Sequence, residues 1–383
     1  MPEPSEPPAV ASPRRLARAV PRIRLGPLLV AFLVSVPIAE GVMRLRVRLQ
    51  GYTTAEARLR YLGMGSTNPV YDPHPILGRV FRPGARFVHR NHLGQEVPWR
   101  INAFGYRGEE IATPKPPGRF RVLCLGASTT FCGENPEGKT YPDVLARLLR
   151  EARPGLDVEA VNAGVPGYTA VETVIDFALG AQALEPDLVI VYHGVNDVNP
   201  ALAPGFRPDY SHWRPFPRGE ARGIEALLQR SFLYLALRQR ARSGAPARSA
   251  PPLADAPPEA IEALGRHTQT LSTLAKARGA RLVVATFAHG IDVYPEMAEE
   301  QVLFLGMAHP AADSFRRTVA RFNEELRATA AREGSLLVDL ASRMPRNRET
   351  YYDWPHWTDE GCAEAAAILA EEILGAGILP PGR

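Results

Sequence analysis

The feature that most constrains the fold is a regular alternation of short apolar runs with amphipathic segments, from about residue 120 to residue 375. Strands that alternate with helices are typical of parallel sheets, because each parallel pair needs a crossover connection. The sequence therefore predicts an α/β fold, with a doubly wound five-stranded parallel sheet between two helical layers. The expected strands are 121–125, 157–162, 188–192, 281–287 and 335–340, and the expected helices are 141–151, 170–184, 259–278, 314–332 and 359–374.

Length and composition exclude several classes of protein. The chain has 383 residues and is 45% hydrophobic, which is enough for one large domain with a smaller extension. The net charge of +4 is modest, the arginines are scattered, and no run of aromatic residues alternates with basic ones, so nucleic-acid binding is not expected. The three cysteines have no CxxC spacing and no clustered histidines beside them, so no metal or other cofactor is expected.

The chain divides into four predicted parts, the last of which contains an insertion. We expect a disordered basic tail over residues 1–24, a transmembrane signal anchor over 25–43, a juxtamembrane extension containing β-structure over 44–118, and the main domain over 119–375 with an insertion at about 199–258. The extension contains two alternating runs, 85–90 and 96–102, around an Asn-His-Leu-Gly turn, which predicts a hairpin. The amphipathic patch 224–239 of the insertion could cap the site or pack on the surface of the core.

The membrane anchor is predicted from an uncharged stretch between basic flanks. Residues 25–39 carry no charge and follow a segment rich in arginine. Continued to Met43, the stretch approaches the length of about 20 residues that a bilayer requires. The expected localisation is a single-pass membrane protein with its main domain on the extracytoplasmic side, although Arg44, Arg46 and Arg48 weaken the orientation signal. The alternative is a buried helix of a soluble domain.

Small and polar residues follow three of the predicted strands, at the edge of a parallel sheet where ligands bind. They are Gly126-Ala127-Ser128, Asn162-Ala163-Gly164 and Gly194-Val195-Asn196-Asp197, and a fourth block, Asp353-Trp354-Pro355-His356, comes after the fifth strand. Each block has an ordinary structural alternative, such as a helix cap, a turn or a histidine in the core. The first block lacks the lysine of a phosphate-binding loop, so an NTPase is not expected.

Taken in order, the four blocks resemble the signature blocks of the SGNH (GDSL-like) serine hydrolases, over about residues 120–375. The segment 102–108 (NAFGYRG) is similar to one found ahead of this domain in bacterial membrane-anchored members. The resemblance implies a flavodoxin-like α/β/α fold and esterase activity. One departure is that Ala127 stands where the family has an aspartate, which puts the geometry of the loop in doubt more than the chemistry.

The resemblance also implies a role for each matched residue. Ser128 would be the nucleophile, His356 its general base and later the acid, and Asp353 the group that holds the imidazole in the useful tautomer. The backbone N–H groups of Ser128 and Gly164 and the side-chain amide of Asn196 would form the oxyanion hole. The expected substrate is an acyl ester, acetyl esters included, of envelope carbohydrate or lipid.

Other interpretations use the same residues or nearby ones. A carbohydrate O-acyltransferase would share the whole site, and a non-catalytic carbohydrate-binding scaffold would keep only the fold. A glycosidase would need two carboxylates, for which Asp197 and Asp353 are the candidates at the strand ends. Arg107 could contact an anionic substrate or pair with Glu109 or Glu110.

Three further features are noted with their alternatives. Cys132 and Cys362 each follow a proposed catalytic residue and could meet, but the sequence does not decide whether they form a disulfide. His193 borders the site and could simply pack beside Asn196. Trp354 and Trp357 could form a platform for a sugar ring or anchor the loop to the core.

Overall fold

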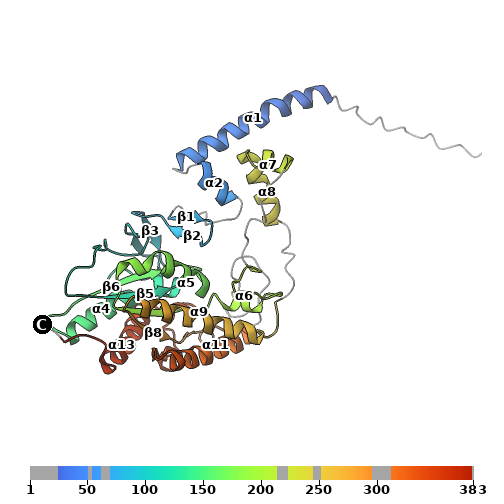
Figure 1. Cartoon of the computed structure of the whole chain (residues 1–383). Helices are drawn as coiled ribbons and strands as arrows, with labels where there is room; N and C mark the ends of the chain where they lie inside the picture. Colours follow the sequence, from blue (N-terminus) through green and yellow to red (C-terminus); the bar gives the residue numbers. More distant parts are fainter. Residues whose placement is uncertain are drawn as a thin grey trace, which may run out of the picture.

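The computed structural model of the chain describes residues 25–50, 54–61, 70–213, 223–244, 252–295 and 312–381. Its centre is a five-stranded sheet, shown with its surrounding helices in Figure 1. All neighbouring strands are parallel, in the order β6-β5-β7-β8-β9. The strands are β5 (Arg119–Gly126), β6 (Asp157–Gly164), β7 (Leu188–Tyr192), β8 (Arg281–Ala285) and β9 (Leu336–Val338). The prediction of an α/β fold with a five-stranded parallel sheet is confirmed.

Two groups of helices enclose this sheet. The chain passes from β5 to one side through α4 (Tyr141–Ala152), and then to the other side through α5 (Ala170–Leu179), α9 (Pro258–Ala277) and α11 (Ala312–Glu333). Right-handed crossovers that run in opposite directions place their helices on opposite faces of a sheet. The helix α13 (Asp359–Gly375) packs against α4, whereas α9 packs against both α5 and α11. The result is a three-layer, doubly wound domain.

Local sequence explains where these elements begin and why they are buried. Strand β7 reads Leu-Val-Ile-Val-Tyr and all five residues are buried, as expected for a strand covered on both faces. Helix α5 begins with a capping box between Thr169 and Glu172, and α13 begins at Thr358, whose hydroxyl accepts from the N–H of Gly361. Three short helices complete the domain: η1 (Ala181–Leu184), α3 (Ser128–Phe131) and α12 (Leu340–Arg343).

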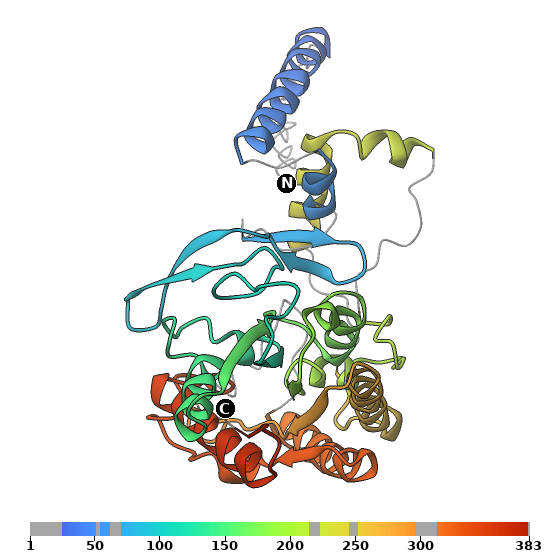
Figure 2. The same ribbon diagram turned by 60° about the vertical axis from the view of Figure 1, so that its left-hand side comes forward.

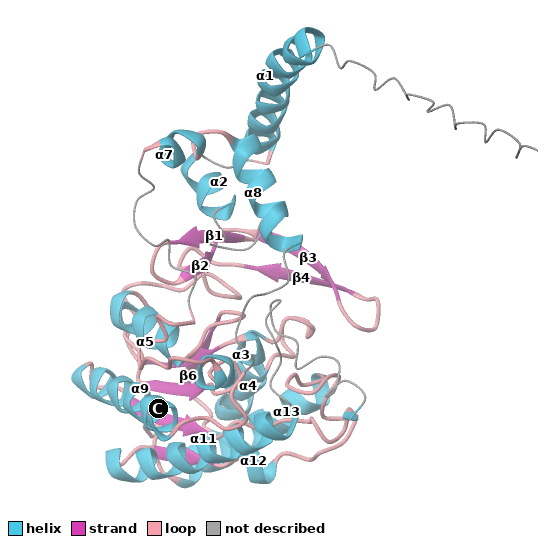
Figure 3. Ribbon diagram, turned by 90° about the vertical axis from the view of Figure 1, so that its right-hand side faces the viewer, coloured by secondary structure: helices cyan, strands magenta, loops and turns pink. Residues whose placement is uncertain are grey.

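The region ahead of the main domain contains two antiparallel hairpins. They are β1 (Tyr71–His74) with β2 (Gly78–Phe81), which the sequence did not predict, and β3 (Arg86–Arg90) with β4 (Glu96–Arg100), which it did. The hairpins lie between the main domain and the N-terminal helices (Figures 2 and 3). A small core joins them to the main domain, because Phe81 and Trp99 pack on Phe131 of α3.

The N-terminal helices α1 (Leu25–Leu49) and α2 (Thr54–Tyr61) pack with part of the insertion rather than with the sheet. The chain between β7 and α9 contains α6 (Val198–Leu202), α7 (Ile224–Leu228) and α8 (Phe232–Gly244), of which α6 is buried in the main core. The carboxylate of Glu40 in α1 accepts from the N–H groups of Phe232 and Leu233, and Phe232 packs beside Val47. Figure 3 shows α8 beside α1 and α2, so the patch 224–239 neither caps the site nor packs on the main core.

The predicted anchor is part of α1, which extends beyond Met43 to Leu49. Within the part of the chain that the structure describes, no helix combines the length and the apolar character needed to cross a bilayer. The membrane anchor therefore stays a prediction. The predicted tail over residues 1–24 lies outside the described residues.

Candidate active site

The register of the sheet brings three of the predicted blocks to one edge. Gly126, the last residue of β5, is paired with Gly164 of β6 on one side and with Tyr192 of β7 on the other. The segments that follow these three residues therefore leave the sheet side by side. Ser128 begins α3 directly after β5, at the carboxyl edge where ligands of α/β sheets bind.

Two glycines permit the close contacts at this edge. A Cβ atom on Gly126 would lie 2.2 Å from the hydroxyl oxygen of Thr130 and 2.5 Å from the carbonyl oxygen of Tyr192. A Cβ atom on Gly164 would lie 2.3 Å from the backbone nitrogen of Phe131. Any side chain at either position would push α3 away from the sheet, so both glycines serve to hold the start of α3 in place.

The fourth block lies against Ser128. The Nε2 atom of His356 is 2.9 Å from the hydroxyl oxygen of Ser128, and its Nδ1 atom is 2.9 and 2.8 Å from the two carboxylate oxygens of Asp353. The carboxylate also accepts from the backbone N–H of His356, at 2.8 Å. The side chains of His356 and Asp353 are 17% and 23% exposed, so a ligand can approach the imidazole without a large rearrangement.

The loop that carries His356 is closed on itself and held against the main domain. Tyr351 and Trp357 form an isolated antiparallel bridge, and the N–H of Gly290 donates to the carbonyl of Trp354 at 2.7 Å. Trp357 is buried and stacks on Tyr192 of β7, with ring centroids 4.9 Å apart. Both tryptophans therefore anchor the loop, and neither offers an exposed platform for a sugar.

The predicted oxyanion donors have different surroundings. The side-chain amide of Asn196 is half-buried and donates one hydrogen to the carbonyl of Tyr168 at 2.8 Å, which fixes its orientation and leaves a second hydrogen. The N–H of Ser128 is at the first turn of α3. By contrast, the N–H of Gly164 donates to the side chain of Asn162 at 3.1 Å, so this amide is already engaged. For Gly164 to serve an oxyanion as predicted, that bond would have to open.

Asp197 supports the Asn196 loop from within the protein. Its carboxylate is fully buried and accepts from the N–H of Ala170 and from the hydroxyl of Tyr210. A buried carboxylate with these partners cannot reach a substrate, so the pair of carboxylates that a glycosidase needs is not formed by Asp197 and Asp353. His193, next to this loop, is also buried, and its Nε2 atom lies 3.2 Å from the hydroxyl of Thr268. It packs inside the domain.

Asp197 should make stability depend on pH. Burial raises the pKa of Asp197 from 3.8 to about 6, so the folded state holds its proton more tightly than the unfolded chain does. Asp197 therefore does not lower the free energy of unfolding below about pH 4. Its contribution becomes unfavourable as the pH rises to 6, and above that it lowers the free energy of unfolding by about 3 kcal/mol. We expect Asp197→Asn to remove this loss, as measured by urea unfolding at pH 4 and pH 7. Wild type and variant losing equal stability over that interval would contradict the assignment.

Arg107 and Asn135 hold the segment that follows Ser128 in place, a role that the sequence did not reveal for either residue. Arg107 is buried and donates to the carbonyls of Phe131, Cys132 and Asn135, directly after the nucleophile helix. Arg107 therefore neither faces a substrate nor pairs with Glu109 or Glu110, contrary to both expectations. The side chain of Asn135 donates to the carboxylate of Asp359 at 2.9 Å. It thereby links the segment after Ser128 to the helix after His356.

The cysteines meet as predicted but are not bonded. Cys132 and Cys362 are free thiols, with their sulfur atoms 3.7 Å apart, and both are buried. Cys124 is a core residue of β5. Among the described residues, no group of three or more His, Cys, Asp or Glu side chains could hold a metal ion.

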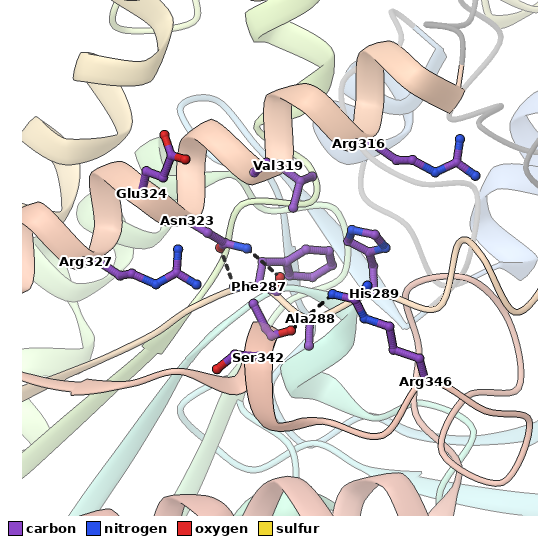
Figure 4. A pocket seen from close by; sticks show the side chains of 12 residues that line it. Phe287, Ala288, His289, Arg316, Val319, Asn323, Glu324, Arg327, Ser342 and Arg346 are labelled. Carbon is purple, nitrogen blue, oxygen red and sulfur yellow. Dashed lines mark hydrogen bonds between the residues drawn. The ribbon is translucent and has the colours of Figure 1, made fainter.

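One pocket is lined by residues that belong to none of the four predicted blocks. It has a volume of about 270 Å³ and lies between α11 and the segment after β8 (Figure 4). Two of its arginines are already neutralised, because Arg316 pairs with Asp292 and Arg327 with Asp339. Burial is the main cause that lowers the pKa of His289 in this pocket to about 4. The pocket has no excess of free positive charge, and we assign it no ligand.

A doubly wound α/β sheet with a serine, an imidazole and a carboxylate joined in series at its carboxyl edge has the architecture of a serine hydrolase. The model of the GDSL-like Lipase/Acylhydrolase family matches residues 124–363, and the chain belongs to this family. It is a hydrolase that acts on ester bonds.

Comparison with curated proteins finds no match, but several solved structures are similar. A GDSL-like lipase from Parabacteroides merdae has 15% identity and a TM-score of 0.43, with 68% of this chain and 96% of that chain covered. An acetylxylan esterase from Geobacillus stearothermophilus has 17% identity and a TM-score of 0.41, with coverage of 66% and 94%. A lipase/acylhydrolase from Enterococcus faecalis has 16% identity and a TM-score of 0.41, with coverage of 69% and 99%.

Proposed function

We propose that the chain is a serine esterase that cleaves acyl esters, acetyl esters among them, of envelope carbohydrate or lipid. The observation that carries the proposal is the continuous series of contacts from Ser128 through His356 to Asp353, at 2.9 and 2.8 Å. A hydroxyl is a poor nucleophile without a base, and an imidazole is a good base only in the right tautomer. His356 would take the proton of Ser128 as the hydroxyl attacks the ester carbonyl, and would give it to the leaving alcohol as the acyl-enzyme forms. Water, with His356 again as the base, would then release the acid and restore Ser128.

The proposal is tested by incubating the purified chain with p-nitrophenyl acetate, with and without oligosaccharide acceptors. We expect release of p-nitrophenol and acetate at a rate that does not depend on the acceptor. Acetylated oligosaccharide in place of free acetate would instead identify an acyltransferase, which uses the same residues. Absence of turnover for a range of acyl chain lengths would contradict both enzymatic functions.

Asn196 gives a more specific test of the oxyanion proposal. Removal of one preorganised donor typically costs on the order of 3 kcal/mol in the barrier, which is a loss of about 10²- to 10³-fold in kcat. We expect this loss for Asn196→Ala, with a smaller change in KM, in assays with p-nitrophenyl acetate. Asn196→Asp keeps the shape but exchanges the donor for an acceptor, so it should be at least as impaired. Near-normal kcat in Asn196→Asp would exclude an oxyanion role for this side chain.

We also propose that the N-terminal part attaches the enzyme to a membrane, with the catalytic domain on the extracytoplasmic side. The support is a set of large apolar side chains on α1, each more than half exposed to solvent. They are Val30, Phe32, Leu33, Val34, Ile38, Val42, Leu45 and Leu49. Cell fractionation tests this proposal: the full chain should sediment with membranes, and a chain that begins at residue 54 should not. Equal partition of the two chains would contradict it.

A further inference from the structure

The turn of the β3–β4 hairpin lies against the loop that carries His356. The imidazole of His92, in this turn, stacks on the ring of Tyr352 with centroids 4.5 Å apart and planes 11° from parallel. Tyr352 in turn stacks on the imidazole of His356, with centroids 5.6 Å apart and planes 6° from parallel. Three nearly parallel rings thus run from the N-terminal extension to the proposed general base.

His92 is held from the main domain, at a segment close to the nucleophile. The carboxylate of Glu134 accepts from the backbone N–H of His92 at 2.6 Å and lies 3.3 Å from its Nδ1 atom. The same carboxylate also contacts the Nε2 atom of His89 in β3. Glu134 is only six positions after Ser128, so the hairpin turn is tied to the segment that follows the nucleophile helix.

Further contacts make this attachment rigid. The indole N–H of Trp99 in β4 donates to the carbonyl of Gly133 at 2.8 Å, and the side chain of Asn91 donates to the carbonyl of Glu134 at 3.3 Å. The hairpin therefore binds the segment 133–134 and, through His92, stacks on the ring of Tyr352. It spans the two loops whose relative position sets the contact between Ser128 and His356.

We propose that His92 is a positioning residue of the active site, which acts through Tyr352 to hold the His356 ring in line with Ser128. Asp353 and Ser128 meet the two nitrogens of the imidazole, and a ring stacked on its face limits the rotation of the imidazole about its Cβ–Cγ bond. The extension is then a functional part of the hydrolase site and not only a spacer. This inference rests on the proposed esterase function.

The test compares variants of His92 in the full chain, with p-nitrophenyl acetate as substrate. His92→Ala removes the outer ring, and we expect kcat to fall about tenfold with KM nearly unchanged, because small misplacements of a catalytic group reduce the rate steeply. His92→Phe keeps a stacking ring without the titratable nitrogens and should restore most of the wild-type kcat. Leu93→Ala is the matched control, since Leu93 is in the same turn and is 68% exposed.

The outcomes separate this inference from the proposed function. Wild-type hydrolysis that is lost in Ser128→Ala establishes the esterase, whatever the His92 variants do. With that activity present, wild-type kcat in His92→Ala would overturn the positioning role. A His92→Phe enzyme as impaired as His92→Ala would also overturn it, because the imidazole nitrogens and not the stack would then matter. An equal loss in Leu93→Ala would point to general damage to the turn and would likewise count against the proposal.

Discussion

Ser128→Ala is expected to lower kcat for p-nitrophenyl acetate by roughly 10⁶-fold. The hydroxyl is the only atom of that side chain that could attack the ester, and in the structure it already lies 2.9 Å from Nε2 of His356. Alanine leaves the backbone of α3 unchanged and keeps the N–H at the first turn. Steady-state kinetics with circular dichroism as a check on folding measure the effect.

A matched substitution controls for this result. Ser342 is an exposed serine of α12 and belongs to none of the blocks of the proposed site. Ser342→Ala should leave kcat and KM unchanged. If Ser128→Ala retained more than a few per cent of the wild-type rate while Ser342→Ala behaved normally, the nucleophile would have to be a different group.

Asp353→Asn is expected to lower kcat by about 10⁴-fold. An asparagine amide facing Nδ1 would favour the tautomer in which Nε2 carries the proton, and that nitrogen could not accept the proton of Ser128. The bond from the backbone N–H of His356 could persist, because the amide oxygen still accepts. The loop should therefore stay folded, and thermal unfolding of the variant should resemble that of the wild type.

The same variant separates two roles for the carboxylate. If Asp353 only shaped the loop, Asp353→Asn would keep the loop and lose less than tenfold in kcat. A loss of several orders of magnitude, with unchanged unfolding behaviour, requires the carboxylate to act on the imidazole.

The main domain could be predicted because its physical signals are local. Strand β7 is an apolar run of five residues and α5 begins with a Thr-x-x-Glu capping box, so composition and spacing suffice for both. The first hairpin was missed because β1 and β2 have only four residues each and Pro73 interrupts the alternation. The packing of α8 on α1 was also missed, since an amphipathic pattern predicts a buried face but not the element that covers it.

The sequence predicted which residues form the proposed site, but it did not predict the contacts that these residues make. The order of the blocks singled out Ser128, Asn196 and His356 as candidates, and the register of β5 with β7 explains why the first two lie at one edge of the sheet. No pattern could show that the N–H of Gly164 donates to Asn162. The ring of His92 gave no signal either, because it acts across the boundary between two parts of the chain.

The measurement that tests the central claim most directly is the reaction of the folded chain with a fluorophosphonate, followed by peptide mass spectrometry. We expect one adduct, on Ser128, with strongly slowed labelling in His356→Ala and none at all in Ser128→Ala. A folded wild-type chain that carried no adduct, or carried it on another residue, would contradict the account.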